Sequence, residues 1–405
     1  MANSEYVLRA ATADEHDQFL GLFAAAMMFE ATPTDLDREL FEPERALVAY
    51  DGDQLVGTAK AMSRDLSVPG AVVPAAHVTA VGVRATHRRR GILAGMMSRQ
   101  LREAPEALAV LWASEAGIYG RFGYAAAAFG VSYEVDLRSV RPRPLPSDSG
   151  RIEEVSAEDA PALLAPLLQA LQATRPGVSG RSEQVWRQHL QDDPAHRGGS
   201  TARQILVHRD ESGAVDGYVL WRGKMNWGPT GPAYEVSVQE LAALDPTAYH
   251  ALWLHLLTLD LAAKLEYGHA AVDEPLLQLV SNPVALGRRL SETLWIRITD
   301  VPRALAQRRY AVATDVVIEV TDDLIEANNG RFRLTGDAEK ATCERTDAAA
   351  DLALSINELS AAYLGGRGLA EFATTERVTE NTPGALAATT AAFGWPLGPQ
   401  SLEIF

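Results

Sequence analysis

Apolar positions along the first 150 residues follow two different periods, which indicates strands mixed with helices. Residues 14–28 and 92–101 carry apolar side chains at helical spacing. Two short apolar runs, 47–50 and 55–59, flank a polar tetrad, Asp-Gly-Asp-Gln, whose glycine tolerates a positive φ. These two runs therefore predict a β-hairpin.

A further strand is predicted over residues 77–83, where β-branched side chains are frequent. It runs into a basic loop that ends at Gly91, directly before the helical spacing resumes. Residues 109–112 predict another short strand, and glycines at every third position between Gly117 and Gly123 then predict a tight turn or an atypical helix. The pattern predicts an α/β unit.

Residues 141–150 hold three prolines and show no apolar period, which is typical of a linker. Beyond them, residues 157–173 and 249–265 predict helices. Strands are predicted over 204–208, 214–221 and 234–241. This order resembles that of the first unit, although no sequence repeat proves a duplication and the basic loop has no counterpart.

A third section is predicted to begin near residue 300. Residues 312–320 and 330–334 have the character of strands, and they precede the segment 356–364 and a final Ala-rich stretch over 384–393, so this section is again predicted to mix α and β. The whole chain is therefore expected to be of mixed α/β (α+β) class, in several domains.

The composition and net charge limit the classes of ligand that the chain is expected to bind. The 405 residues include 37 Lys and Arg against 53 Asp and Glu, which gives a net charge of −16, and 47% of them are hydrophobic. Such a chain is expected to be globular, and the charge argues against nucleic acid as a partner and suits a cationic or amine ligand. The only cysteine, Cys343, cannot form an internal disulfide.

No targeting or metal-binding pattern stands out. The first 20 residues contain four acidic side chains and do not form a signal peptide, so we expect a cytoplasmic protein. The longest apolar runs are far shorter than the roughly 20 residues that a membrane span needs. The nine histidines show no HExxH spacing and no cysteine cluster exists, so no metal is expected.

The basic loop carries the clearest chemistry. Arg88, Arg89 and Arg90 precede Gly91 between a predicted strand and a predicted helix. Guanidinium groups and free N–H groups at a helix N-terminus favour a bound phosphate. The alternative is a solvated basic turn, but the position after an apolar strand favours an anion site.

This segment, from Val81-Gly82-Val83 to Arg88-Arg89-Arg90-Gly91-Ile92-Leu93, resembles the acetyl-coenzyme A motif of the GNAT superfamily, (Q/R)-x-x-G-x-(G/A). It departs from the motif at Leu93, where a small residue is usual. Together with the segment Ala113-Ser114-Glu115-x-Gly117-Ile118-Tyr119-Gly120-Arg121-Phe122-Gly123-Tyr124, it resembles the enhanced intracellular survival (Eis) acetyltransferases.

The resemblance covers the whole chain, strongly over residues 77–124 and mainly in architecture after residue 150. It implies two tandem GNAT folds and a sterol-carrier-protein-like C-terminal domain. The expected limits are a catalytic domain over 1–147, a degenerate GNAT-like domain over 148–299 and the C-terminal domain over 300–405. It further implies a hexamer.

The resemblance also implies the site residues. Acetyl-coenzyme A would be held at a strand bulge and by the loop amides; the expected contacts are Val81, Gly82, Val83, Arg88, Arg89, Gly91, Ile92 and Ser114. The implied catalytic pair is Tyr119 as the acid and the carboxylate of Phe405 as the base. Residues 401–405 alternate in polarity and stop without a polar tail, which favours a docked terminus over a frayed one.

Weaker expectations concern the acceptor. Glu30 and Glu403 are expected to hold ammonium groups. Ala80 stands where an aromatic residue is usual in mycobacterial members, which suggests a roomier or differently shaped acceptor site. The expected activity is acetyl transfer from acetyl-coenzyme A to amines of a polycationic small molecule such as an aminoglycoside. The alternatives are a protein lysine or arylamine acetyltransferase, and a non-catalytic lipid-binding or regulatory protein.

Overall fold

The computed structural model describes residues 6–144 and 150–405. These residues form two compact units. The first comprises 6–127, Leu294–Pro396 and Phe405, and the second comprises Ala128–Thr293 and Leu397–Ile404. Residues 145–149 of the predicted linker, with the expected limit between 147 and 148, lie outside the described part of the chain. The proposed domain limits stay predictions.

The first unit is built on a seven-stranded sheet with the order β1-β2-β3-β4-β5-β16-β6. Its neighbours are antiparallel except for the parallel pair β4 and β5. The predicted hairpin is confirmed as β2 and β3, and the predicted strands at 77–83 and 109–112 as parts of β4 and β5. The strands are β1 (Val7–Ala10), β2 (Ala46–Asp51), β3 (Gln54–Val68), β4 (Ala71–Val83), β5 (Leu108–Trp112), β6 (Ala125–Ala126) and β16 (Leu294–Ile298).

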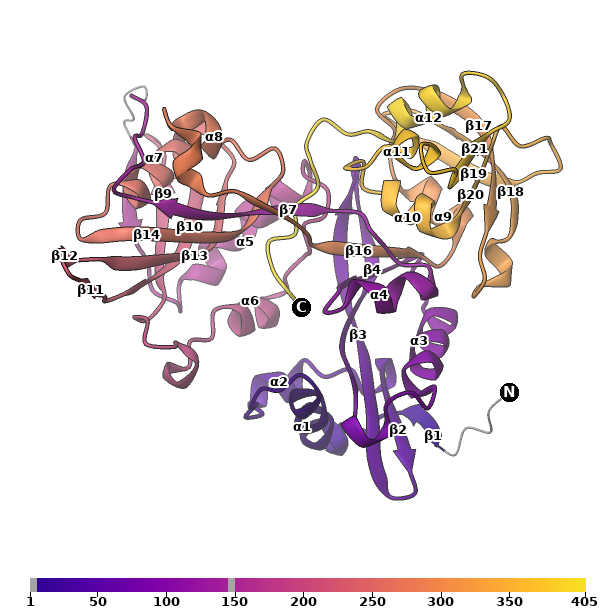
Figure 1. Cartoon of the computed structure of the whole chain (residues 1–405), viewed down its shortest axis with the longest axis horizontal. Coiled ribbons are helices and arrows are strands. Elements are labelled where there is room, and N and C mark those ends of the chain that lie inside the picture. Colours follow the sequence, from indigo (N-terminus) through magenta and orange to yellow (C-terminus); the bar gives the residue numbers. More distant parts are fainter. Residues whose placement is uncertain (1–5, 145–149) are drawn as a thin grey trace. The chain divides into compact units, whose positions relative to one another are not determined.

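Two amphipathic helices cover opposite faces of this sheet (Figure 1). Phe19 of α1 packs with Val48 on one face, whereas Met96 of α3 packs with Leu47 and Ala59 on the other. Alternation along β2 thus separates the two cores, as a strand period of two requires. The helices of this part are α1 (His16–Ala26), α2 (Asp35–Glu39), α3 (Ile92–Glu103) and α4 (Ala116–Tyr119).

The second unit repeats the plan, with the order β8-β9-β10-β13-β14-β7-β15 when its sheet is read from β8. Here β13 and β14 form the parallel pair. The strands are β7 (Phe129–Asp136), β8 (Arg151–Glu154), β9 (Gln204–Arg209), β10 (Val215–Lys224), β13 (Tyr234–Ala243), β14 (Ala262–Ala271) and β15 (Arg289–Glu292), with β11 (Trp227–Gly228) and β12 (Gly231–Pro232) in a separate hairpin. The helices are α5 (Ala160–Gln172), α6 (Glu183–His189), α7 (Pro246–Leu257) and α8 (Leu276–Leu279).

The two sheets exchange one strand. The place next to β5 in the first sheet is taken by β16, which follows the second unit in the chain, while the matching place beside β14 is taken by β7, which follows the first. Each sheet is therefore completed by a strand from the other half of the sequence. The local pattern of apolar residues carries no sign of this exchange.

The helix predicted over 249–265 is wrong in its second half. The helix α7 ends at Leu257, Leu261 adopts a positive φ of 67°, and β14 begins at Ala262. Residues 262–265 pair in parallel with β13 instead of continuing the helix. Apolar residues recur on both sides of Thr258 and Asp260 and continue beyond the turn, so the period alone did not mark the boundary.

The C-terminal section lies in the first unit as a five-stranded sheet with helices. Its order is β19-β18-β17-β20-β21. The strands are β17 (Thr314–Thr321), β18 (Gly330–Gly336), β19 (Ala341–Arg345), β20 (Leu352–Ser355) and β21 (Val378–Glu380), and the helices are α9 (Val301–Gln307), α10 (Ile356–Ala362), α11 (Leu369–Ala373) and α12 (Ala385–Phe393). No helix within the described ranges combines the length and apolar composition that a membrane crossing requires.

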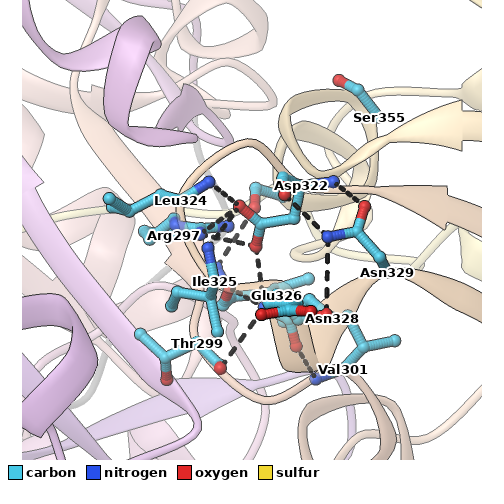
Figure 2. Close-up of polar contacts among 12 residues, drawn as sticks. Arg297, Thr299, Val301, Asp322, Leu324, Ile325, Glu326, Asn328, Asn329 and Ser355 are labelled. Atoms are coloured by element: carbon cyan, nitrogen blue, oxygen red, sulfur yellow. Dashed lines mark hydrogen bonds and ion pairs between the residues drawn. The ribbon is translucent and has the colours of Figure 1, made fainter. Parts of the chain in front are cut away.

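A buried ion pair joins this section to the first sheet (Figure 2). Arg297 of β16 donates from Nη2 to both carboxylate oxygens of Asp322, at 2.8 and 2.6 Å, and both side chains are almost fully buried. Asp322 also accepts from the backbone N–H groups of Leu324 and Ile325 and from Asn328 Nδ2. The carboxylate therefore organises the loop after β17 around a cation supplied by the first sheet.

Candidate active site

The centre of the site is a bulge in β4. Thr58 of β3 pairs with Gly82 but Lys60 pairs with Thr79, so two residues of β4, Ala80 and Val81, oppose one residue of β3. Ala80 has a positive φ of 52°, and its carbonyl accepts a hydrogen bond from Thr58 Oγ1 at 3.0 Å. A bulge of this kind turns backbone groups out of the ladder, where they become available to a ligand.

The strands on either side of this bulge separate. Pairing between β4 and β5 is limited to Ala76 with Ala109 and His77 with Val110. Beyond these residues β4 continues to Val83 without a β5 partner. This part of β4, which includes the expected contacts Val81, Gly82 and Val83, pairs with β3 alone. The point where two parallel strands cease to pair is the usual place for a ligand in such sheets.

The basic loop leads from β4 into the N-terminus of α3. Gly91 is the N-cap of α3 with a φ of 83°, and no side chain caps the helix there. The first N–H groups of α3, from Ile92 onward, are thus available to an anion. Arg88 and Arg89 are exposed, and Arg89 has a positive φ of 63°.

A buried histidine fixes the start of the loop. His87 is 8% exposed, and its Nε2 lies 3.1 Å from Asp51 Oδ2 while its Nδ1 lies 2.8 Å from Thr86 Oγ1. Arg90 also reaches Asp51, at 3.4 Å. Sequence reasoning did not identify Asp51 and His87 as residues that hold the basic loop in place, although His87 directly precedes Arg88. They hold the loop on β2 and leave Arg88 and Arg89 facing solvent.

Tyr119 occupies the glycine-rich segment after β5. This segment forms α4 and a following turn, as the spacing predicted. The Tyr119 side chain is buried, and burial raises the pKa of its phenol above 10, with a smaller opposite effect from its hydrogen bond to Ser114. Such a phenol stays protonated at neutral pH and is suited to donating a proton.

The C-terminal section holds the Tyr119 segment. Asn357 of α10 donates from Nδ2 to the carbonyls of Gly120 and Tyr124, at 2.8 and 3.0 Å. A Cβ added at Gly123 would lie 2.7 Å from the Arg297 guanidinium, so only glycine leaves room for this cation. Asn357 and Arg297 were missed by sequence reasoning, because nothing local marks them.

Phe405 belongs to the first unit. Its ring is 4.7 Å from the His77 ring, centroid to centroid, and His77 is fully buried in β4. His77 is three residues before Ala80. Phe405 therefore contacts the strand that carries the bulge, within the unit that also contains Tyr119 and Arg88.

The three residues expected to line the acceptor site lie in three different surroundings. Ala80 forms part of the bulge and is buried. Glu30 is exposed and follows the C-terminal end of α1, and this end of the helix packs against Gly82 of β4. Glu403 belongs to the second unit, where its Oε2 lies 3.2 Å from Arg181 Nε. Their roles stay predictions.

Among residues 6–144 and 150–405, no group of three or more His, Cys, Asp or Glu side chains is placed to hold a metal ion.

Three family models match the chain: acetyltransferase (GNAT) domains over residues 7–127 and 177–298, and a sterol carrier protein domain over residues 301–400. They confirm two GNAT domains followed by a sterol-carrier-protein-like domain.

Whole-chain relatives agree. An uncharacterized N-acetyltransferase of Streptomyces avermitilis is 42% identical over 370 residues, 90% of each chain, and the N-acetyltransferase Eis of Mycobacterium tuberculosis is 31% identical over 372 residues, 88% of each. The crystal structure of Eis1 from Mycobacterium abscessus matches with a TM-score of 0.85 and 34% identity, covering 98% of this chain and 100% of that one. The chain therefore belongs to the Eis-like, acetyl-coenzyme A dependent N-acetyltransferases of the GNAT superfamily.

Proposed function

We propose that this enzyme acetylates amines of a polycationic small molecule such as an aminoglycoside, with the Phe405 carboxylate as the base and Tyr119 as the acid. The observation that supports the proposal is the contact between the Phe405 and His77 rings, because His77 lies on β4 three residues before the Ala80 bulge. We propose a cytoplasmic homo-oligomer, a hexamer by resemblance to the family.

Acetyl-coenzyme A is proposed to bind along β4 and α3. Val81, Gly82 and Val83 lie in the part of β4 that has no β5 partner, and their backbone groups would contact the thioester and its arm. The uncapped helix start at Gly91 and Ile92, with the exposed Arg88 and Arg89, would hold the pyrophosphate. Ser114, which hydrogen-bonds Tyr119, is proposed to contact the arm as well.

The proton steps follow from the two side groups. A terminal carboxylate has a reference pKa of about 3.5 and is ionised at neutral pH, so it accepts a proton from the acceptor ammonium. The neutral amine then attacks the thioester carbonyl carbon, a C–N bond forms, the nitrogen gives up its extra proton to solvent and the C–S bond breaks. The departing sulfur takes the proton of Tyr119, which is kept on the phenol by burial. The phenol is reprotonated from solvent.

The acceptor side is proposed to favour cations. Glu30 is exposed near the end of α1 and is proposed to bind an ammonium group by a charge-assisted hydrogen bond. The small side chain at Ala80 leaves the bulge without an aromatic wall. The net charge of −16 adds a general attraction for polycations, although it does not locate a pocket.

The test replaces the Phe405 carboxylate by a primary amide, made by ligation, and measures coenzyme A release with aminoglycosides, diamines and lysine peptides. We expect transfer to fall by about 100-fold or more, as for loss of a general base. A protein tagged before Met1 is the matched control and should keep full activity. An amidated protein with full activity would refute the carboxylate as base, and a preference for lysine peptides would refute the small-molecule acceptor.

A further inference from the structure

The second unit has the same strand order as the first, but the helix N-terminus that would correspond to the expected phosphate site is already capped by a side chain. The helix after β13 is α7, which corresponds in order to α3 after β4. Its N-cap is Asp245, whose carboxylate accepts from Thr247 N–H at 2.7 Å, and Pro246 supplies no N–H at the first position. A carboxylate already occupies the helix N-terminus, so a phosphate has no place there.

The segment 397–404 is fixed to this unit by backbone contacts along its length. Arg175 donates to the Gly398 carbonyl at 2.7 Å and pairs with Asp273 at 2.8 Å, and Asp273 in turn accepts from Gly398 N–H at 2.9 Å. Gln400 N–H donates to the Pro176 carbonyl and its side chain donates to the His269 carbonyl of β14.

Two features show close packing around this segment. Gly177 has a φ of 89°, and a Cβ placed there would lie 2.9 Å from the Gln400 carbonyl oxygen. Leu402 is 4% exposed and belongs to the core formed by α5, α6 and β10. The segment is thus packed into the unit as part of its core, not laid over its surface.

A buried cluster of charges holds the end of the segment. Arg181, almost fully buried, donates to both oxygens of Glu240, at 2.9 and 2.7 Å, and its Nε lies 3.2 Å from Glu403 Oε2. His189 lies 3.1 Å from Glu240 and 3.7 Å from Glu403, and the Tyr218 hydroxyl donates to Glu240. Glu403 is thus the one member of this cluster that comes from the C-terminal segment.

The balance of charges in the cluster keeps Arg181 and Glu240 charged. Burial opposes the charge on Arg181, but Glu240 and Glu403 outweigh it and raise the Arg181 pKa. Burial likewise opposes the charge on Glu240, but Arg181 and His189 hold its pKa well below the usual range. A desolvated ion pair of this kind is directional, so it fixes the position of each carboxylate that it binds.

We propose that the second GNAT-like unit is a socket for the C-terminal segment, and that Arg181 and Glu403 are positioning residues that set where the Phe405 carboxylate lies. Glu403 is two residues before Phe405, so its ion pair limits the reach of the terminus. The consequence for catalysis rests on the proposed function of the Phe405 carboxylate. The socket itself rests only on contacts within the second unit.

Two variants test the socket without removing a buried charge from the centre of the cluster. Glu403→Gln keeps the shape of the side chain and removes the ion pair to Arg181, and Gly177→Ala forces a Cβ against Gln400. Glu153→Gln is the matched control, since this carboxylate of the same unit pairs with Arg151 and Arg209 on β8 and β9. Carboxypeptidase A release of Phe405, followed by intact mass, reports the freedom of the terminus directly.

We expect Glu403→Gln to release Phe405 about 10- to 100-fold faster than the parent chain, as for loss of one charge-assisted contact. Gly177→Ala should also release it faster, because the new Cβ displaces Gln400, and the control should match the parent. Steady-state kinetics should show a lower kcat with an unchanged KM for acetyl-coenzyme A. Unchanged release of Phe405 in both variants would overturn the socket, and a raised acceptor KM alone in Glu403→Gln would assign Glu403 to the acceptor instead. Faster release with an unchanged kcat would uphold the socket and refute the role of Arg181 and Glu403 in positioning the Phe405 carboxylate.

Discussion

Replacing Asp322 by Asn should strongly destabilise the first unit. The Asp322 carboxylate is the partner of Arg297, and both side chains are at most 1% exposed. Breaking a buried pair by removing one charge typically costs about 3–5 kcal/mol, because the remaining charge is left uncompensated in a low dielectric. For a cooperative unit of roughly 150–250 residues, each kcal/mol lowers Tm by about 2–4 °C. The expected decrease is therefore roughly 6–20 °C.

Thermal unfolding followed by intrinsic fluorescence measures this shift, with Asp315→Asn as the matched control. Asp315 also pairs with an arginine through two hydrogen bonds, at 2.8 and 2.6 Å to Arg333, but its side chain is 52% exposed. An exposed pair of this kind contributes at most about 1 kcal/mol, so the control should lose only a few degrees. A Tm for Asp322→Asn equal to that of Asp315→Asn would refute the argument from burial.

Four further outcomes are expected. Arg89→Ala should weaken acetyl-coenzyme A binding about 10- to 150-fold by calorimetry, through loss of a charge-assisted phosphate contact, and unchanged affinity in both this variant and Arg88→Ala would remove the anion site. Tyr119→Phe should lower kcat by about 100-fold or more without a change in Tm, and equal turnover would move the acid elsewhere. Asn357→Ala, which frees two carbonyls of the Tyr119 segment, should lower kcat about 10-fold with the acetyl-coenzyme A KM unchanged, and a normal kcat would show that the segment needs no support. Burial raises the pKa of Glu274 to about 7 from an ordinary 4.5. The free energy of unfolding therefore carries its full contribution from this group below about pH 4.5 and loses it, by roughly 3 kcal/mol, as the pH rises to about 7. Urea titrations at several pH values should show this loss, and Glu274→Gln should abolish it.

The local parts of the candidate site could be predicted from the sequence. The loop from Arg84 to Gly91 and the segment that carries Tyr119 are continuous in the chain, and their glycines mark backbone conformations that few other residues adopt. A strand, a basic loop and a helix follow one another directly, so the uncapped start of α3 was visible in the order of residues. The bulge at Ala80 came from the family resemblance and not from the pattern.

The supporting residues could not be predicted, because they act across long stretches of chain. Arg181 and Glu403 are 222 residues apart, and Asn357 lies 237 residues from the Gly120 carbonyl that it binds. Arginine, glutamate and asparagine are common on surfaces, so nothing in their own neighbourhood indicates burial. Only the packing of α6, β13 and the C-terminal segment removes the charges of Arg181 and Glu403 from water.

By itself, the sequence determined the mixed α/β class, the hairpin, the basic loop before α3 and the glycine-rich segment around Tyr119, since each depends on the period or the backbone freedom of neighbouring residues. The tertiary structure alone decided which strand completes each sheet, where Phe405 lies and which carboxylate meets Arg181. These choices compare free energies of contacts between segments far apart in the chain, through burial of apolar strands such as β16 and pairing of charges withdrawn from solvent. A local pattern records that a segment is apolar or charged but does not record its partner.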